Sequence, residues 1–98
     1  MKEITPIEVK ELLESGEQLN LVDVREDDEV AEGIIPGAIH IPLGEVAGRV
    51  DELEKSKPYI IICRSGGRSG RATEFLEGAG YDATNMTGGM LEWEGETE

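Results

Sequence analysis

The most informative part of the 98-residue chain is the segment Ile60-Ile61-Ile62-Cys63-Arg64-Ser65-Gly66-Gly67-Arg68-Ser69. Three consecutive isoleucines leave no polar face, so the segment begins with a predicted strand that is buried on both sides of a sheet. The strand ends directly in a cysteine, which small and basic residues follow. Apolar residues then recur at helical spacing from Ser69 to Leu76, so the sequence predicts a strand, a tight loop and a helix in succession.

The loop after Cys63 has the features of an anion-binding site. A cysteine that follows a buried strand lies at the carboxyl edge of the sheet, where open α/β folds bind their ligands. Glycines let the backbone curl around the sulfur with its N–H groups inward, and a helix beginning near Ser69 adds its positive end. Arg64 and Arg68 add full positive charges. We therefore expect the pKa of the Cys63 thiol to lie below the free value of about 8.5. The alternative, an inert buried cysteine, leaves the flanking glycines and arginines unexplained.

The rest of the chain predicts strands that alternate with helices. Thr5-Pro6-Ile7-Glu8 is a capping box that starts the first helix, and Gly16 is a natural stop for it. The expected strands cover residues 19–24, 38–41, 59–62 and 82–86, and the other expected helices cover residues 25–31, 46–53, 69–76 and, as a final turn, 90–93. This alternation favours one α/β domain with a mainly parallel sheet covered by helices on both faces. We assign residues 1–98 to this domain, with about 93–98 as a tail or linker stub.

Net charge excludes several classes of partner. The chain has 22 acidic and nine basic residues and a formal charge of −13. A protein this acidic repels phosphate backbones and anionic lipid, so we expect no nucleic-acid and no membrane partner. Three of the basic residues, Arg64, Arg68 and Arg71, nevertheless fall within eight residues, which indicates that an anion is handled there.

Cysteine and histidine usage is equally restrictive. One cysteine cannot form an internal disulfide, and one cysteine with one histidine cannot make a structural zinc site, so we expect no metal and no other cofactor. The longest apolar cluster, Tyr59-Ile60-Ile61-Ile62-Cys63, is far shorter than the roughly 18 residues of a membrane span. The first residues do not resemble a secretory signal, which predicts a cytoplasmic protein.

The loop from Cys63 to Ser69 resembles the active-site loop of the rhodanese family. Three further segments resemble the family's other signatures in the right order: Leu21-Val22-Asp23-Val24-Arg25, then Ile35-Pro36-Gly37-Ala38-Ile39-His40-Ile41-Pro42, then Gly80-Tyr81 with Asn85-Met86-Thr87-Gly88-Gly89-Met90 and Trp93. Four ordered motifs are more specific than any one alone. Val30 and Ile34 stand where the family often has an aromatic residue and a histidine. Both lie outside the loop, so these departures bear on packing or partner preference.

The resemblance implies a five-stranded α/β fold and a thiosulfate sulfurtransferase. The thiolate of Cys63, the catalytic residue, would take sulfane sulfur from a donor such as thiosulfate and become a persulfide. A nucleophilic acceptor, cyanide in an assay and a small or protein thiol in the cell, would then remove the sulfur. The two arginines would bind the donor's charge, and the serines would donate hydroxyl hydrogen bonds. The implied substrate-binding residues are Arg64, Ser65, Gly66, Gly67, Arg68 and Ser69.

Four residues outside the loop are assigned structural roles. In the family the residues equivalent to Asp23 and Arg25 support the active-site side of the fold by polar contacts. His40 ends a short strand, and sulfur transfer needs no proton from it, so it is interpreted as a structural histidine. Trp93 is assigned to packing near the loop.

Two other functions remain open. Cysteine-dependent phosphatases and arsenate reductases also use a cysteine in a loop closed by arginine, but their pattern places five residues between the two, whereas four separate Cys63 from Arg68. The shorter loop suits a sulfur atom better than a tetrahedral phosphate. The second alternative is a sulfur-carrier or protein-interaction module in a relay.

Overall fold

The computed structural model describes residues 1–98 and contains one parallel five-stranded sheet. Its strands lie in the order β1-β5-β4-β2-β3, and every neighbouring pair is parallel. The strands are β1 (Lys2–Ile4), β2 (Leu21–Asp23), β3 (Ile39–His40), β4 (Pro58–Ile62) and β5 (Asp82–Met86). The central strand is therefore β4, which supplies the apolar run before Cys63. This confirms the expected five-stranded α/β fold.

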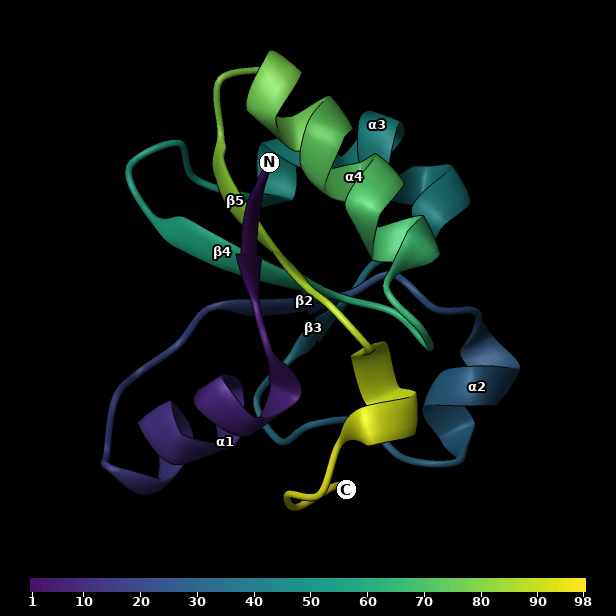
Figure 1. The fold of residues 1–98 in the computed structure, drawn as a ribbon. Helices are drawn as coiled ribbons and strands as arrows, with labels where there is room; N and C mark the ends of the chain where they lie inside the picture. The colour runs from purple at the N-terminus through teal and green to yellow at the C-terminus, as the bar shows by residue number, and fades with distance from the viewer.

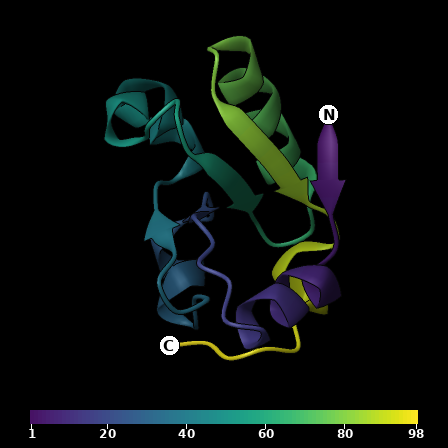
Figure 2. The same cartoon turned by 90° about the vertical axis from the view of Figure 1, so that its left-hand side faces the viewer.

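Helices cover both faces of the sheet (Figure 1). The α-helices are α1 (Pro6–Glu14), α2 (Asp27–Ala31), α3 (Val46–Arg49) and α4 (Gly67–Gly78), and the 3₁₀ turns are η1 (Leu43–Glu45), η2 (Val50–Glu52) and η3 (Gly89–Glu92). Figure 2 shows α4 on one side of β5, with α1 and η3 at the other end of the molecule. Two apolar clusters correspond to the two faces, one of 11 buried residues and one of five. No helix combines the length and the apolar character that crossing a bilayer requires.

The capping signals of the first helix are confirmed. The Thr5 hydroxyl accepts a hydrogen bond from the Glu8 N–H at 3.2 Å, and the Glu8 carboxylate accepts one from the Thr5 N–H at 3.0 Å. The helix ends at Ser15, and Gly16 follows with φ of +91°, where a residue without a Cβ is favoured. This reciprocal cap fixes where α1 leaves β1.

Two local predictions were wrong, and one strand was not predicted. The long helix expected over 46–53 is instead the four-residue α3 with a 3₁₀ turn on each side, because Gly48 and two β-branched valines favour helix poorly. The helical spacing of apolar residues over 69–76 predicts Phe75 on the core side of α4, but Phe75 is 44% exposed. The buried residues of α4 are Ser69, Gly70, Ala72, Thr73 and Leu76. Strand β1 was not predicted, because its three largely exposed residues carry no apolar pattern.

The strand order reverses direction at β2 and β4, so Cys63 follows a switch point of the sheet. From β2 the chain continues to β3, toward one edge of the sheet. From β4 it continues to β5, toward the opposite edge. The carboxyl ends of β2 and β4 are thus neighbours whose following segments diverge, which is where open α/β sheets bind ligands. Asp23 pairs with Ile62 in register, so the residues after Asp23 lie beside Cys63.

Candidate active site

The backbone around Cys63 is held from below by η3. The N–H groups of Met90 and Leu91 donate to the carbonyl oxygens of Cys63 and Arg64, at 2.9 and 3.0 Å. This close approach needs a glycine at Gly89, where φ is +59° and a Cβ would lie 2.4 Å from the Arg64 carbonyl group. These two hydrogen bonds fix the backbone at the start of the loop.

Hydrogen-bond donors converge on the Cys63 sulfur. The Gly66 N–H donates to Sγ at 3.0 Å, and the Ser69 hydroxyl lies 3.3 Å from Sγ. Gly66 has φ of +103° and caps α4, which begins at Gly67, two residues before the predicted start. The helix N-terminus therefore lies closer to the sulfur than the sequence indicated.

The pKa of Cys63 reflects two opposed effects. Burial, which leaves the residue 1% exposed, would raise the pKa of the thiol. Hydrogen bonds from the Ser69 hydroxyl and from the backbone N–H groups of Ser69, Gly66 and Ser65 outweigh burial and lower the pKa below its ordinary value. The direction agrees with the sequence prediction, which did not include the opposing effect of burial.

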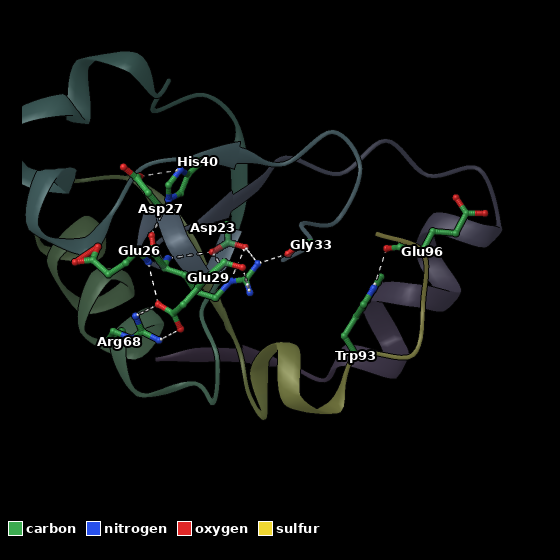
Figure 3. Close-up of polar contacts among 10 residues, drawn as sticks. Asp23, Glu26, Asp27, Glu29, Gly33, His40, Arg68, Trp93 and Glu96 are labelled. Carbon is green, nitrogen blue, oxygen red and sulfur yellow. Dashed lines mark hydrogen bonds and ion pairs between the residues drawn. The ribbon is translucent and has the colours of Figure 1, made fainter. Parts of the chain in front are cut away.

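The two loop arginines are placed differently. Arg64 is exposed at the rim of the loop. Arg68 is half-buried and forms a bidentate ion pair with Glu29 of α2, with N–O distances of 2.6 and 2.8 Å (Figure 3). This hydrogen-bonded guanidinium lowers the pKa of Glu29 to about 2. Part of the positive charge expected at the loop is therefore neutralised by a carboxylate that the sequence did not reveal.

Asp23 and Arg25 form a second, buried ion pair at the end of β2. The Arg25 Nε donates to Asp23 Oδ1 at 3.0 Å, and Nη2 donates to Oδ2 at 2.9 Å. A further bond of 2.7 Å from Nη2 to the Gly33 carbonyl ties the pair to the segment after α2 (Figure 3). The pair thus links the end of β2 to the segment that follows α2.

Residues 5–96 match the model of the Rhodanese-like domain family. The chain belongs to this family. A Bacillus subtilis protein named "Putative sulfurtransferase YtwF" is 48% identical over 98 residues, which cover all of this chain and 95% of that protein. A protein named "Sulfurtransferase" from Allochromatium vinosum is 35% identical over 95% of this chain and 88% of its own length. A rhodanese-like domain protein from Staphylococcus aureus has a crystal structure with a TM-score of 0.95 at 40% identity, and the match covers 100% of this chain and 97% of that one.

Two further signature residues of this rhodanese-like domain, His40 and Trp93, contact the backbone and the apolar core. His40 Nε2 lies 2.7 Å from the Arg25 carbonyl oxygen, so the imidazole ring is hydrogen-bonded to the backbone. Trp93 packs against the apolar cluster on the α1 side of the sheet and donates from Nε1 to the Glu96 carbonyl at 3.0 Å. In Figure 3 it lies well away from Arg68. Ile34 and Glu98 exchange two backbone hydrogen bonds, at 2.8 and 3.1 Å, so the end of the chain folds back onto the domain.

Sequence reasoning missed three residues of the site: Glu29, Asn85 and Gly89. Asn85 had a detectable signal, because it shares the buried parity of β5 with Ala83, where an apolar side chain is expected. Gly89 was named only as part of a family signature. Glu29 is one of many acidic residues, and nothing in its spacing indicates a contact with Arg68, which is 39 residues away.

Proposed function

We propose that this rhodanese-like domain is a sulfurtransferase that carries sulfane sulfur as a persulfide on Cys63. The observation that carries the proposal is the set of donors around Sγ, with the Gly66 N–H at 3.0 Å and the Ser69 hydroxyl at 3.3 Å. Such fixed donors favour an anion on sulfur, and they need no reorganisation when charge develops there. The relatives named as sulfurtransferases in Bacillus subtilis and Allochromatium vinosum support the same function.

The proposed reaction has two steps. The Cys63 thiolate attacks the outer sulfur of thiosulfate, the sulfur–sulfur bond of the donor breaks, and its electron pair leaves with sulfite. The enzyme then holds a Cys63 persulfide anion. Cyanide or a thiolate attacks the outer sulfur of this group, and the Cys63 thiolate is the leaving group, which restores the starting state. This is covalent catalysis by an activated cysteine.

The burial of Cys63 restricts the donor. Because the residue is 1% exposed, the transferred sulfur has to be terminal and slender, as the outer sulfur of thiosulfate is. Exposed Arg64 and Ser65 stand at the rim, where they can meet the sulfonate group of the donor. Arg68 can bind the donor in one of two ways. Its guanidinium either contacts the donor while it remains paired with Glu29, or it breaks the ion pair with Glu29 first.

A relay role is supported by one further relative. A Bacillus subtilis protein named "Putative sulfur carrier protein YrkF" is 43% identical over 90 residues, which form 91% of this chain and 49% of that protein. In a relay the same persulfide on Cys63 would pass to a protein thiol. The chemistry of the first step is unchanged, and the two roles differ only in the acceptor.

Mass spectrometry of the intact protein after incubation with thiosulfate tests the proposal. We expect the mass of one added sulfur atom, removed by cyanide with release of thiocyanate. The matched control is Cys63→Ser, which should gain no sulfur while its far-UV circular dichroism is unchanged. Sulfur uptake by the serine variant, or none by the wild type, contradicts the mechanism. Hydrolysis of p-nitrophenyl phosphate by the wild type would favour the phosphatase alternative.

A further inference from the structure

Asn85 is a buried polar side chain that the proposed sulfur transfer does not use. It lies on β5 and is 4% exposed. Its Nδ2 donates to the Gly66 carbonyl at 3.2 Å, and its Oδ1 lies 2.5 Å from the Ser69 hydroxyl. Both partners belong to the loop and helix start that surround the sulfur, whereas Asn85 comes from the neighbouring strand.

The hydrogen bonds of Asn85 fix the direction of each donor. A carbonyl oxygen can only accept, so the NH₂ group of Asn85 has to face Gly66 and its oxygen has to face Ser69. Since the amide oxygen also only accepts, the bond between Asn85 and Ser69 uses the single proton of the Ser69 hydroxyl. That proton is then shared between two acceptors, Asn85 Oδ1 at 2.5 Å and Cys63 Sγ at 3.3 Å.

We propose that Asn85 is a positioning residue that sets how strongly Ser69 and Gly66 stabilise charge on the Cys63 sulfur. Its NH₂ group holds the Gly66 peptide, whose N–H donates to Sγ at 3.0 Å. Its oxygen competes with Sγ for the Ser69 proton. The benefit of this arrangement to catalysis rests on the proposed sulfurtransferase function. The hydrogen bonds themselves concern the Cys63 sulfur before any sulfur is transferred to it.

The competition gives Asn85 a purpose in the two-step reaction. In the thiolate, the full charge on Sγ attracts the Ser69 proton. When the persulfide forms, Sγ becomes the inner, bonded sulfur and the charge moves to the outer sulfur. The Ser69 hydroxyl can then turn to Asn85 instead of being left buried without an acceptor, which would be unfavourable. Rotation of the Ser69 hydroxyl is enough for this change of acceptor, and no covalent bond is made or broken.

The charged groups near Cys63 are Arg64, Arg68 and Glu29. Arg68 is the charged side chain that acts on the sulfur, and Glu29 pairs with it. Arg64 is exposed. Asn85 hydrogen-bonds to Ser69 and Gly66 rather than to these charged groups, so Asn85→Leu changes the donor arrangement without changing the charges around the sulfur. Thr73 supplies a matched control, because its hydroxyl donates to the Ser69 carbonyl at 2.7 Å, it is equally buried, and it does not reach Sγ.

A double-mutant cycle on the ionisation of Cys63 tests the inference. The pH midpoint of the ultraviolet thiolate absorbance, taken as the difference from the matching Cys63→Ser variant, is measured with and without Ser69→Ala, in wild-type, Asn85→Leu, Asn85→Asp and Thr73→Val backgrounds. Leucine cannot accept the Ser69 proton, so we expect Ser69→Ala to raise the midpoint more in Asn85→Leu than in wild type, by about half a pH unit or roughly threefold in the ionisation constant. An aspartate accepts that proton more strongly, so the shift in Asn85→Asp should be smaller than in wild type.

The order of the three shifts decides the outcome. Leu above Asn above Asp supports competition for the proton, and a shift in Thr73→Val equal to the wild-type shift shows that the coupling is specific. Equal shifts in all backgrounds, or the reverse order, overturn the inference. If Asn85→Leu does not fold, the isosteric Asn85→Asp still tests the sign. Persulfide formation in the wild type is measured separately, so a failed sulfurtransferase function and a failed role of Asn85 are told apart.

Discussion

Two arginine–carboxylate pairs flank the Cys63 loop, and they differ in burial and in the number of partners. In the pair at the end of β2, the Asp23 side chain is 0% exposed and the Arg25 side chain 8%. In the pair between α4 and α2, the Arg68 side chain is 29% exposed and the Glu29 side chain 23%. Both pairs are bidentate, so the difference lies in what else each guanidinium contacts.

The guanidinium of Arg25 is held from several directions. Besides Asp23, it donates to the carbonyls of Gly33 and Glu29, at 2.7 and 3.4 Å, and no side of it is left for a substrate. Arg68 has side-chain hydrogen bonds to Glu29 alone. A charge with one partially exposed partner can exchange that partner for an anion, whereas a buried and fully bonded charge cannot do so without a large cost. We infer that Arg25 serves stability and Arg68 serves donor binding.

The largest effect should follow from Asp23→Ala, which leaves the Arg25 charge buried and unpaired. We expect the free energy of unfolding to fall by about 3–5 kcal/mol, the range for breaking a buried ion pair from one side. Urea denaturation followed by circular dichroism measures this change. The double variant Asp23→Leu with Arg25→Met removes both charges and should recover much of the loss. A loss below about 1 kcal/mol in the single variant would place this pair with the exposed ones.

The second prediction concerns Arg68→Ala. Because the pair with Glu29 is partly exposed, we expect the free energy of unfolding to fall by no more than about 1 kcal/mol. The KM for thiosulfate should rise, with a lower kcat/KM, by roughly tenfold if one charge-assisted contact to the donor is lost. Steady-state kinetics with cyanide as acceptor gives both constants. Full activity in Arg68→Ala would assign the residue to the surface.

The fold could be predicted from sequence wherever burial and capping leave a local pattern. The apolar run of β4 and the reciprocal cap of α1 are examples, and both were placed to within a residue or two. Strand β1 could not be predicted, because a short edge strand gains its stability from pairing with β5 and needs no apolar face. The broken helix around α3 shows the reverse case, in which apolar spacing was present but Gly48 weakened the helix.

The site could be predicted as a loop but not as a set of contacts. The order of cysteine, glycines and serine indicated donors directed at sulfur, because those residues are contiguous in the chain. Glu29 and Asn85 reach the loop from α2 and β5, and contacts over such separations leave no local trace in one sequence. The net positive charge beside the loop was therefore overestimated, because the sequence did not indicate that Glu29 pairs with Arg68.

The smallest expected effect, and the one that separates the two pairs most directly, is that of Glu29→Gln. Glutamine keeps an acceptor for the Glu26 N–H at the start of α2, which Glu29 Oε1 binds at 3.0 Å, but it removes the negative charge beside Arg68. With its guanidinium less neutralised, Arg68 should bind the donor better, so the KM for thiosulfate should fall by about two- to fivefold, within the range of a partly exposed pair. Asp28→Asn is the matched control, since it removes the same charge from the same helix at an exposed position, and its KM should change less.

The pH dependence of stability tests whether Arg68 is paired with Glu29 in the folded protein. The folded-state pKa of Glu29 is about 2, below its ordinary value of 4.5, so the stabilisation from its pairing is complete above about pH 4.5 and is lost as the pH falls through about 2. The difference in unfolding free energy between wild type and Glu29→Gln should follow that course when urea denaturation is repeated from pH 7 downward. A difference that disappears already near pH 4.5 would mean that the carboxylate titrates normally and that Arg68 is not held by it. In that case Arg68 would be free to meet the donor from the start, and Glu29→Gln should leave the KM unchanged.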